Sequence, residues 1–132
     1  LVSENKTLCF PASADSIPTS LGQEDHVSMG SIGARKLHKV IDNLEYILAI
    51  ELLYAAQAID LRRPLRSSEV LEACHELVRE TVPFAAEDRI FAYDIERLHG
   101  LISSGRLVQR VNQAAGTHEY QLSLPEFEVF DL

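Results

Sequence analysis

Basic residues are scarce in this chain. Twelve lysines and arginines stand against 20 aspartates and glutamates, which gives its 132 residues a formal charge of −8. Nucleic-acid binding depends on lysine and arginine side chains that displace the counterions of the phosphate backbone. The acidic balance therefore argues against a nucleic-acid partner.

Cysteine is also rare. The two cysteines, Cys9 and Cys74, lie far apart in the sequence and form no CxxC pair. Two thiols cannot build the dense disulfide framework of a small secreted domain, so we expect a reducing compartment, the cytoplasm.

No segment predicts a membrane span or a targeting leader. The longest apolar stretch, residues 46–59, is interrupted by Glu51 and Gln57 and is shorter than the roughly 20 residues that a bilayer span needs. The only methionine is Met29, and the chain begins with Leu1 and a polar run. We therefore expect a soluble piece of a longer polypeptide, with no membrane partner.

The usual signals of metal and nucleotide sites are missing. No two of the five histidines have the i, i+4 spacing that places two ligands on one helix face, so no metal site is expected. The chain has no GxGxxG, P-loop or GxSxG motif, and Gly30 and Gly33 form only a weak GxxG pair. Cys74 and His75 are neighbours that point in different directions on a helix, which predicts a packed thiol and an exposed imidazole.

The feature that the chain does have is helical periodicity. Residues 25–61 contain no proline, and their apolar residues recur at steps of three and four, which places them on one helix face. Pro64 cannot continue this helix. Shorter helices are predicted over residues 67–82, where Ser67 is the expected cap, and over about 92–103. The fold class is therefore mainly α, a helical bundle with one long central helix.

Part of the long helix, residues 46–59, is apolar nearly all the way round. Such a helix has to be buried on every side, and a chain of this size has few elements to surround it. Two explanations stay open. Further sequence or sister subunits supply the other walls, or the later helices of this chain wrap the long one.

Two segments flank the predicted helical segment, residues 25–104. Residues 1–24 are rich in proline, serine and threonine, which predicts a long loop. Such loops are commonly functional, and four apolar residues indicate that this one is packed: Leu8, Cys9, Phe10 and Ile17. The tail, residues 105–132, fits an irregular arm or a hairpin in which the strand of Tyr120, Leu122 and Leu124 pairs with Leu107, Val108 and Val111.

Glu24 and Asp25, followed by His26, stand where the loop becomes the long helix. Carboxylates in a first helical turn complement the helix dipole and the free amide groups, and this alone explains the pair. The alternative is a binding site, because a packed loop that leads into a rigid helix holds binding residues in place.

Short motifs then follow one another in a fixed order along residues 1–103. They are ENK, PAS, DSIPTS, QEDHVSMG and ARK in the first 36 residues, and LAIELL, AAQ, DLR, VPF, EDR and DIE after them. In this order they resemble the C-terminal third of histidine ammonia-lyases, within the aromatic amino acid ammonia-lyase family. The ordered set is far more specific than any single motif.

The resemblance implies an activity that this chain cannot complete alone. Enzymes of this family convert L-histidine to urocanate and ammonia with a methylidene-imidazolone electrophile, formed from an internal Ala-Ser-Gly that is absent here. The family's catalytic base also comes from earlier sequence, and three subunits of a homotetramer build each active site. The expected fold is therefore a larger, all-helical, tetrameric lyase, and the isolated chain is expected to be inactive.

The resemblance implies roles for two residues of this chain. Glu24 matches the family's catalytic glutamate that approaches the substrate imidazole, whose N–H donates a charge-assisted hydrogen bond that a phenyl ring cannot offer. Gln23 is expected to be a second substrate contact, and Asp25 and His26 to be supporting residues. Phe10 stands where many members have histidine, and the tail from about residue 104 matches no part of the family pattern.

Other functions stay open. A tyrosine or phenylalanine ammonia-lyase or aminomutase shares the scaffold, usually with a neutral or differently arranged pattern at the position of Glu24. A non-catalytic helical assembly module is the alternative that the over-buried helix and the missing electrophile suggest.

Overall fold

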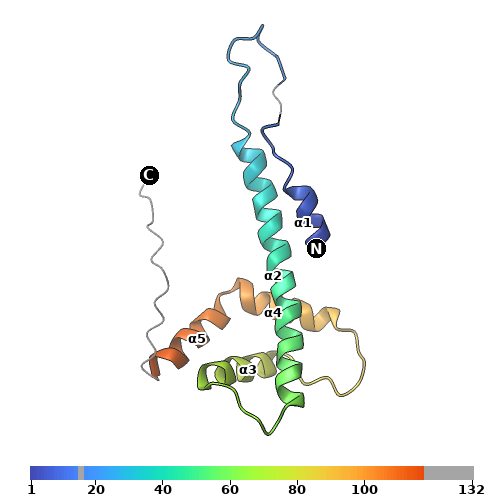
Figure 1. The fold of residues 1–132 in the computed structure, drawn as a ribbon, viewed down its shortest axis with the longest axis vertical. Helices are drawn as coiled ribbons and strands as arrows, with labels where there is room; N and C mark the ends of the chain where they lie inside the picture. The colour runs from blue at the N-terminus through green and yellow to red at the C-terminus, as the bar shows by residue number, and fades with distance from the viewer. Residues whose placement is uncertain (15–16, 118–132) are drawn as a thin grey trace.

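The computed structural model describes residues 1–14 and 17–117, and over these residues it is built from helices (Figure 1). In chain order they are α1 (Val2–Leu8), α2 (Gly30–Leu61), α3 (Glu69–Thr81), α4 (Ala92–Ser103) and α5 (Arg106–Thr117). No strand occurs within the described ranges, which confirms the mainly α fold class.

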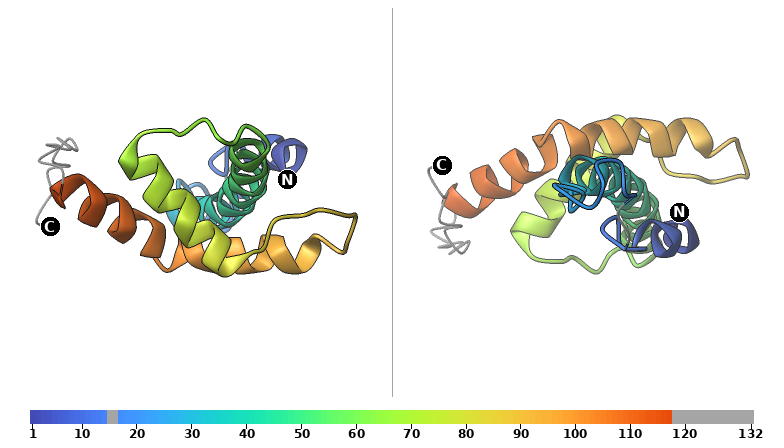
Figure 2. Two further views of the ribbon diagram at one scale, coloured as in Figure 1. Left: turned by 90° about the horizontal axis from the view of Figure 1, so that it is seen from below. Right: turned by 90° about the horizontal axis from the view of Figure 1, so that it is seen from above.

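The long helix α2 is the axis of the molecule. Helix α1 lies beside its N-terminal half, α3 and α4 contact α2 further along, and α5 packs on α3 and α4 (Figure 1). Seen along α2, α4 crosses one side of it and α5 continues outward from α4, while α1 lies on another side (Figure 2). The two ends of α2 therefore have different surroundings.

The hydrophobic core lies at the C-terminal half of α2. Ala49 and Ala56 are small side chains that let the other helices approach α2 closely, and Leu98 of α4 is fully buried beside them. The rest of the core comes from α2, α3, α4 and the residue after α3: Leu53, Leu77, Val78, Val82 and Leu101. Burial of such side chains is the main source of stability in a bundle of this kind.

The described residues leave the remaining faces of α2 uncovered. Tyr54 is 73% exposed, Leu61 71% and Leu37 58%, and four further large apolar residues of α2 are also exposed: Ile32, Ile41, Leu44 and Leu48. The later helices thus wrap only one side of α2. The exposed apolar side chains agree with the first of the two explanations, in which other protein surfaces pack on this helix.

A helix within the predicted loop is the first difference from the sequence analysis. Residues 1–24 were expected to be loop throughout, but Val2–Leu8 form α1. Tertiary contact explains this, because the buried Asn43 of α2 donates hydrogen bonds to Glu4 at 2.9 Å and to Asn5 at 2.8 Å. The composition of residues 1–24 could not predict this contact with α2.

Two helix starts also differ. α2 begins at Gly30 and not at residue 25, because the preceding residues form a turn that is hydrogen-bonded within the loop. The cap of α3 is Ser68 and not Ser67, and its hydroxyl accepts from the backbone N–H of Leu71 at 3.4 Å.

The prediction of a hairpin in the tail is wrong for its first strand. Leu107, Val108 and Val111 belong to α5, which follows a turn at Gly105, whose φ of +72° suits glycine. Arg110 ties α5 to α3 through the carbonyl of Ala73, at 3.3 Å. The other predicted strand, at Tyr120, Leu122 and Leu124, lies outside the described residues.

Candidate functional site

The loop between α1 and α2 carries the residues that the sequence singled out. It extends beyond the N-terminal end of α2, away from the hydrophobic core (Figure 1). Gln23 and Glu24 are both exposed in it. The backbone N–H of Gln23 donates to the carbonyl of Ser20 at 2.9 Å, and Glu24 has a φ of +57°, in the left-handed region.

Asp25 organises this part of the loop. Its Oδ1 accepts from the backbone N–H groups of Thr19 and Ser20, each at 2.9 Å, and its Oδ2 accepts from that of Gly22 at 2.8 Å. The hydroxyl of Thr19 also donates to Oδ1, at 3.2 Å. These hydrogen bonds, that of the Thr19 N–H foremost, lower the pKa of Asp25, so the carboxylate is ionised at neutral pH.

The helix-start explanation of the acidic pair is therefore wrong. The N-cap of α2 is Met29, no side chain caps it, and the first turn contains no acidic residue. The carboxylate of Asp25 stabilises the loop and does not lie in the first turn of the helix. Glu24 takes part in none of the side-chain hydrogen bonds and ion pairs found among residues 1–14 and 17–117.

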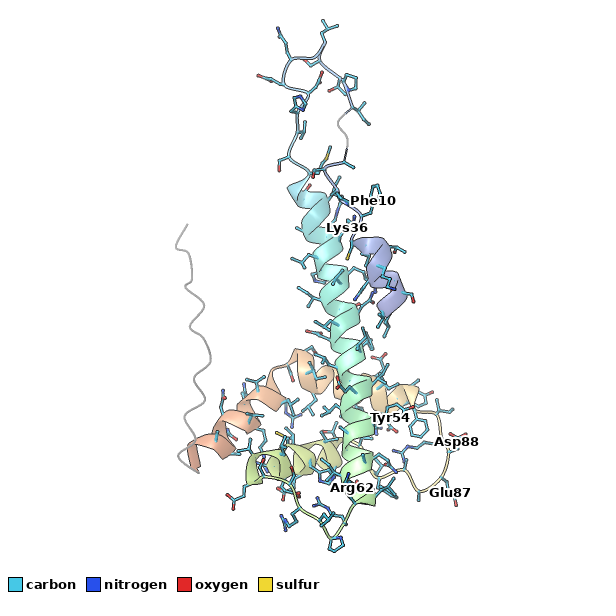
Figure 3. All side chains as sticks on the ribbon, viewed as in Figure 1. Phe10, Lys36, Tyr54, Arg62, Glu87 and Asp88 are labelled. Carbon is cyan, nitrogen blue, oxygen red and sulfur yellow. The ribbon has the colours of Figure 1, made fainter. Side chains whose placement is uncertain are left out.

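The residues that the structure describes cover little of the rest of this loop. Lys36 of α2 donates a hydrogen bond to the carbonyl of Phe10 (Figure 3), yet the ring of Phe10 is 69% exposed. Ile17 is 77% exposed and Cys9 is exposed as well, while Leu8 is half-buried. Over the described residues, the prediction of a packed loop is therefore wrong for Cys9, Phe10 and Ile17.

A mostly apolar cavity of about 430 Å³ lies near the other end of α2. Its walls include Leu53, Tyr54 and Phe91, and Asp88 lies at its rim. Figure 3 shows Tyr54 and Asp88 far from the loop that carries Glu24. Gln57 also lines the cavity, and its side-chain amide donates to the carbonyl of Ala85 at 2.9 Å and accepts from the N–H of Ala85 at 3.1 Å. The cavity therefore brings together none of the predicted site residues.

His75 is buried, contrary to the expectation of an exposed imidazole. Its Nε2 lies 2.9 Å from Oδ1 of Asp60, out of line for a hydrogen bond, and Asp60 also accepts from Nε of Arg79 at 2.6 Å. Cys74 is only half-buried, and burial raises the pKa of its thiol. The sequence did not reveal this cluster, because Asp60 and His75 come from different helices.

A second histidine cluster joins α2 to α4. The ring of His99 stacks on Tyr46 with ring centroids 4.0 Å apart, and its Nε2 lies 3.2 Å from Glu45. The hydroxyl of Tyr46 donates to Glu96 at 3.0 Å. No group of three or more histidine, cysteine, aspartate or glutamate side chains in the described part of the chain could hold a metal ion. The cluster is a contact between two helices.

None of the helices formed by the described residues is long and apolar enough to cross a membrane.

Comparison with known proteins gives a consistent pattern. The family model for aromatic amino acid lyases matches residues 1–80. Histidine ammonia-lyases of Natranaerobius thermophilus and Sorangium cellulosum are each 56% identical to this chain over 116 residues, which is 88% of the chain and 23% of each relative. The chain thus spans less than a quarter of the length of these curated relatives.

Solved structures of two enzymes share the fold. Histidine ammonia-lyase from Trypanosoma cruzi superposes with a TM-score of 0.81 at 53% identity, over 86% of this chain and 22% of that one. Tyrosine aminomutase from Streptomyces globisporus has a TM-score of 0.80 at 38% identity, over the same shares. The helices described above are therefore arranged as in part of these larger, all-helical enzymes.

Proposed function

Because the chain belongs to the aromatic amino acid lyase family, we propose that it is part of a cytoplasmic ammonia-lyase that converts L-histidine to urocanate and ammonia. Sequence identity supports histidine as the substrate. The histidine ammonia-lyase from Trypanosoma cruzi is 53% identical to this chain, whereas the tyrosine aminomutase is 38% identical. Glu24 is the residue of this chain that we assign to the substrate.

The exposed carboxylate of Glu24 carries this proposal. It stands on a hydrogen-bonded turn and makes no hydrogen bond or ion pair to the described residues, so it is available to a ligand. An imidazole N–H can donate to it, and a hydrogen bond to an ionised acceptor is stronger than one between neutral groups. A phenyl ring has no such donor. Gln23, the exposed neighbour, is the second proposed substrate contact.

The electrophile would come from another part of the polypeptide. The methylidene-imidazolone of this family forms from Ala-Ser-Gly, and the sequence of this chain contains no such tripeptide. When present, that group accepts electrons as ammonia leaves. The residues of this chain do not fit a site for its formation, so the role that we assign to them is to bind and orient the imidazole.

Substitution of Glu24 in the full-length enzyme tests the proposal. Glu24→Gln keeps the size of the side chain and removes its charge, and we expect kcat/KM for L-histidine to fall about 10- to 100-fold. Urocanate formation measures this. Asp88→Asn, which removes an exposed carboxylate from another loop, is the matched control and should leave turnover unchanged. Unchanged turnover by Glu24→Gln would show that the role given to Glu24 is wrong.

Tyrosine aminomutase activity is the second candidate. The observation in its favour is the TM-score of 0.80 with the tyrosine aminomutase from Streptomyces globisporus. The products separate the two candidates, because an aminomutase keeps the nitrogen in its amino acid product and a lyase releases ammonia.

We also propose that the full-length enzyme is a homotetramer. The uncovered apolar side chains of α2, such as Leu37 and Tyr54, support an arrangement in which other protein surfaces pack on this helix.

A further inference from the structure

The turn that carries Glu24 is closed by the residue next to it. Asp25 accepts three backbone N–H groups and one hydroxyl from residues 19–22, at 2.8–3.2 Å. The N–H of Gln23 is held separately by the carbonyl of Ser20. Glu24 therefore lies between two residues whose positions are fixed by hydrogen bonds.

Glu24 has a backbone conformation that needs such support. Its φ of +57° is one that residues with a side chain rarely adopt, and Leu21 in the same turn has a φ of +53°. Conformations of this kind persist only where surrounding interactions determine them. If the bonds to Asp25 were lost, Glu24 could relax to a negative φ, and its carboxylate would then point in another direction.

The hydrogen bonds of Asp25 use both of its oxygens. Oδ1 accepts from Thr19 and Ser20, and Oδ2 accepts from Gly22. An asparagine has one acceptor oxygen and would present an N–H₂ group to one set of these donors. Asp25 does not cap α2 or complement its dipole, because the helix begins five residues later, at Gly30.

We propose that Asp25 is a positioning residue, whose carboxylate holds the turn of residues 19–25 so that Glu24 faces the substrate imidazole. This inference rests on the proposed function, since it assigns Asp25 an effect on histidine turnover that acts through Glu24. Asp25 itself does not touch the substrate. It sets the direction of the neighbouring side chain before the substrate binds.

A double-mutant cycle in the full-length enzyme tests this inference. Asp25→Asn is made alone and together with Glu24→Gln, and kcat and KM for L-histidine are measured for each variant. We expect Asp25→Asn alone to lower kcat/KM about 10- to 100-fold, as for other small displacements of a positioned group. In the Glu24→Gln background the same substitution should cost less than about threefold, because the carboxylate that it positions is already gone.

Two further variants separate positioning from folding. Thr19→Val removes only the hydroxyl donor and should give a smaller loss with the same dependence on Glu24. It also carries the test if Asp25→Asn does not fold. Asp88→Asn is again the matched control, and thermal unfolding of each variant shows whether the fold is intact.

The outcomes are distinct. If Glu24→Gln lowers turnover while Asp25→Asn leaves it unchanged, or lowers it equally in both backgrounds, Asp25 has no positioning role and the proposed function still stands. If Glu24→Gln leaves turnover unchanged, the role of Glu24 and the positioning inference are both overturned. A loss that depends on Glu24, with unfolding temperatures unchanged, supports the inference.

Discussion

Adjacent carboxylates have different surroundings in this molecule. The carboxylate of Asp25 accepts four hydrogen bonds within its loop, while the carboxylate of Glu24 accepts none from the described residues. A third carboxylate, that of Glu72, is buried at the start of α3 and accepts from Nη1 and Nη2 of Arg63 at 2.9 and 2.7 Å. Carboxylates of similar intrinsic acidity thus stabilise the turn and the fold, and the one that makes no such contact, Glu24, is the one that we propose for the substrate.

Glu72 makes the fold sensitive to acid. The Arg63 guanidinium foremost, and the backbone N–H of Ser67, lower the pKa of Glu72 from 4.5 to about 2. A carboxyl whose pKa is lower in the folded state contributes stability above its unfolded pKa, and this contribution is lost as the pH falls towards the folded value. The relevant range is therefore from about pH 4.5 down to about pH 2.

We expect Glu72→Gln to reduce the pH dependence of unfolding in that range. Denaturant unfolding of the full-length protein at a series of pH values measures it. Glu80→Gln, which changes an exposed carboxylate on the same helix, is the control and should keep the parental dependence. Equal curves for Glu72→Gln and the parent would contradict the account.

At the scale of the element, α2 presents a different environment at each end. Its N-terminal end carries the turn of residues 19–25, and its C-terminal half carries the hydrophobic core. The rigid helix connects them. A substitution in the core is therefore expected to affect stability, and a substitution in the turn to affect substrate binding.

Leu98 of α4 tests the core. It is fully buried against the C-terminal half of α2, and Leu98→Ala should lower the free energy of unfolding by about 2–5 kcal/mol because it leaves a cavity. Leu98→Met, which nearly keeps the volume, should cost less than about 1.5 kcal/mol. Denaturant unfolding of the full-length protein compares them. An equal effect of both variants would show that Leu98 is not packed as described.

Periodicity predicted those elements whose apolar stripe is long enough to be visible in sequence. The stripe of α2 and the interruption at Pro64 are local features of the chain. Helix α1 has only seven residues and depends on Asn43, which is 38 residues away from Asn5. Its formation could not be predicted from composition, because the stabilising contact is tertiary.

For the candidate site, too, the sequence predicted local features and missed the tertiary contacts. Their motif proposes Glu24 and Gln23 as site residues, and this stays a prediction. The turn that holds them could not be predicted, because a run of Thr, Ser and Gly does not show which backbone N–H groups donate to one carboxylate. The pair of the buried His75 and the half-buried Asp60 was missed for a related reason, since its members come from two helices that meet only in the fold.

For the whole molecule, two observations support the proposal that the chain works as part of a larger structure. It spans 23% of its curated histidine ammonia-lyase relatives, and it leaves apolar side chains of α2 and of the loop, such as Tyr54 and Phe10, exposed. Exposed apolar surface of this extent is typical of a binding face. The chemistry that we propose is therefore completed by surfaces outside these 132 residues.

The most direct test is the product formed by the full-length enzyme from each aromatic amino acid. L-histidine, L-tyrosine and L-phenylalanine are supplied separately, and the products are identified by mass spectrometry, with ammonia measured in parallel. We predict that histidine gives urocanate and an equal amount of ammonia, with far slower turnover of the other two. Conversion of tyrosine or phenylalanine, with no urocanate from histidine, would contradict the account.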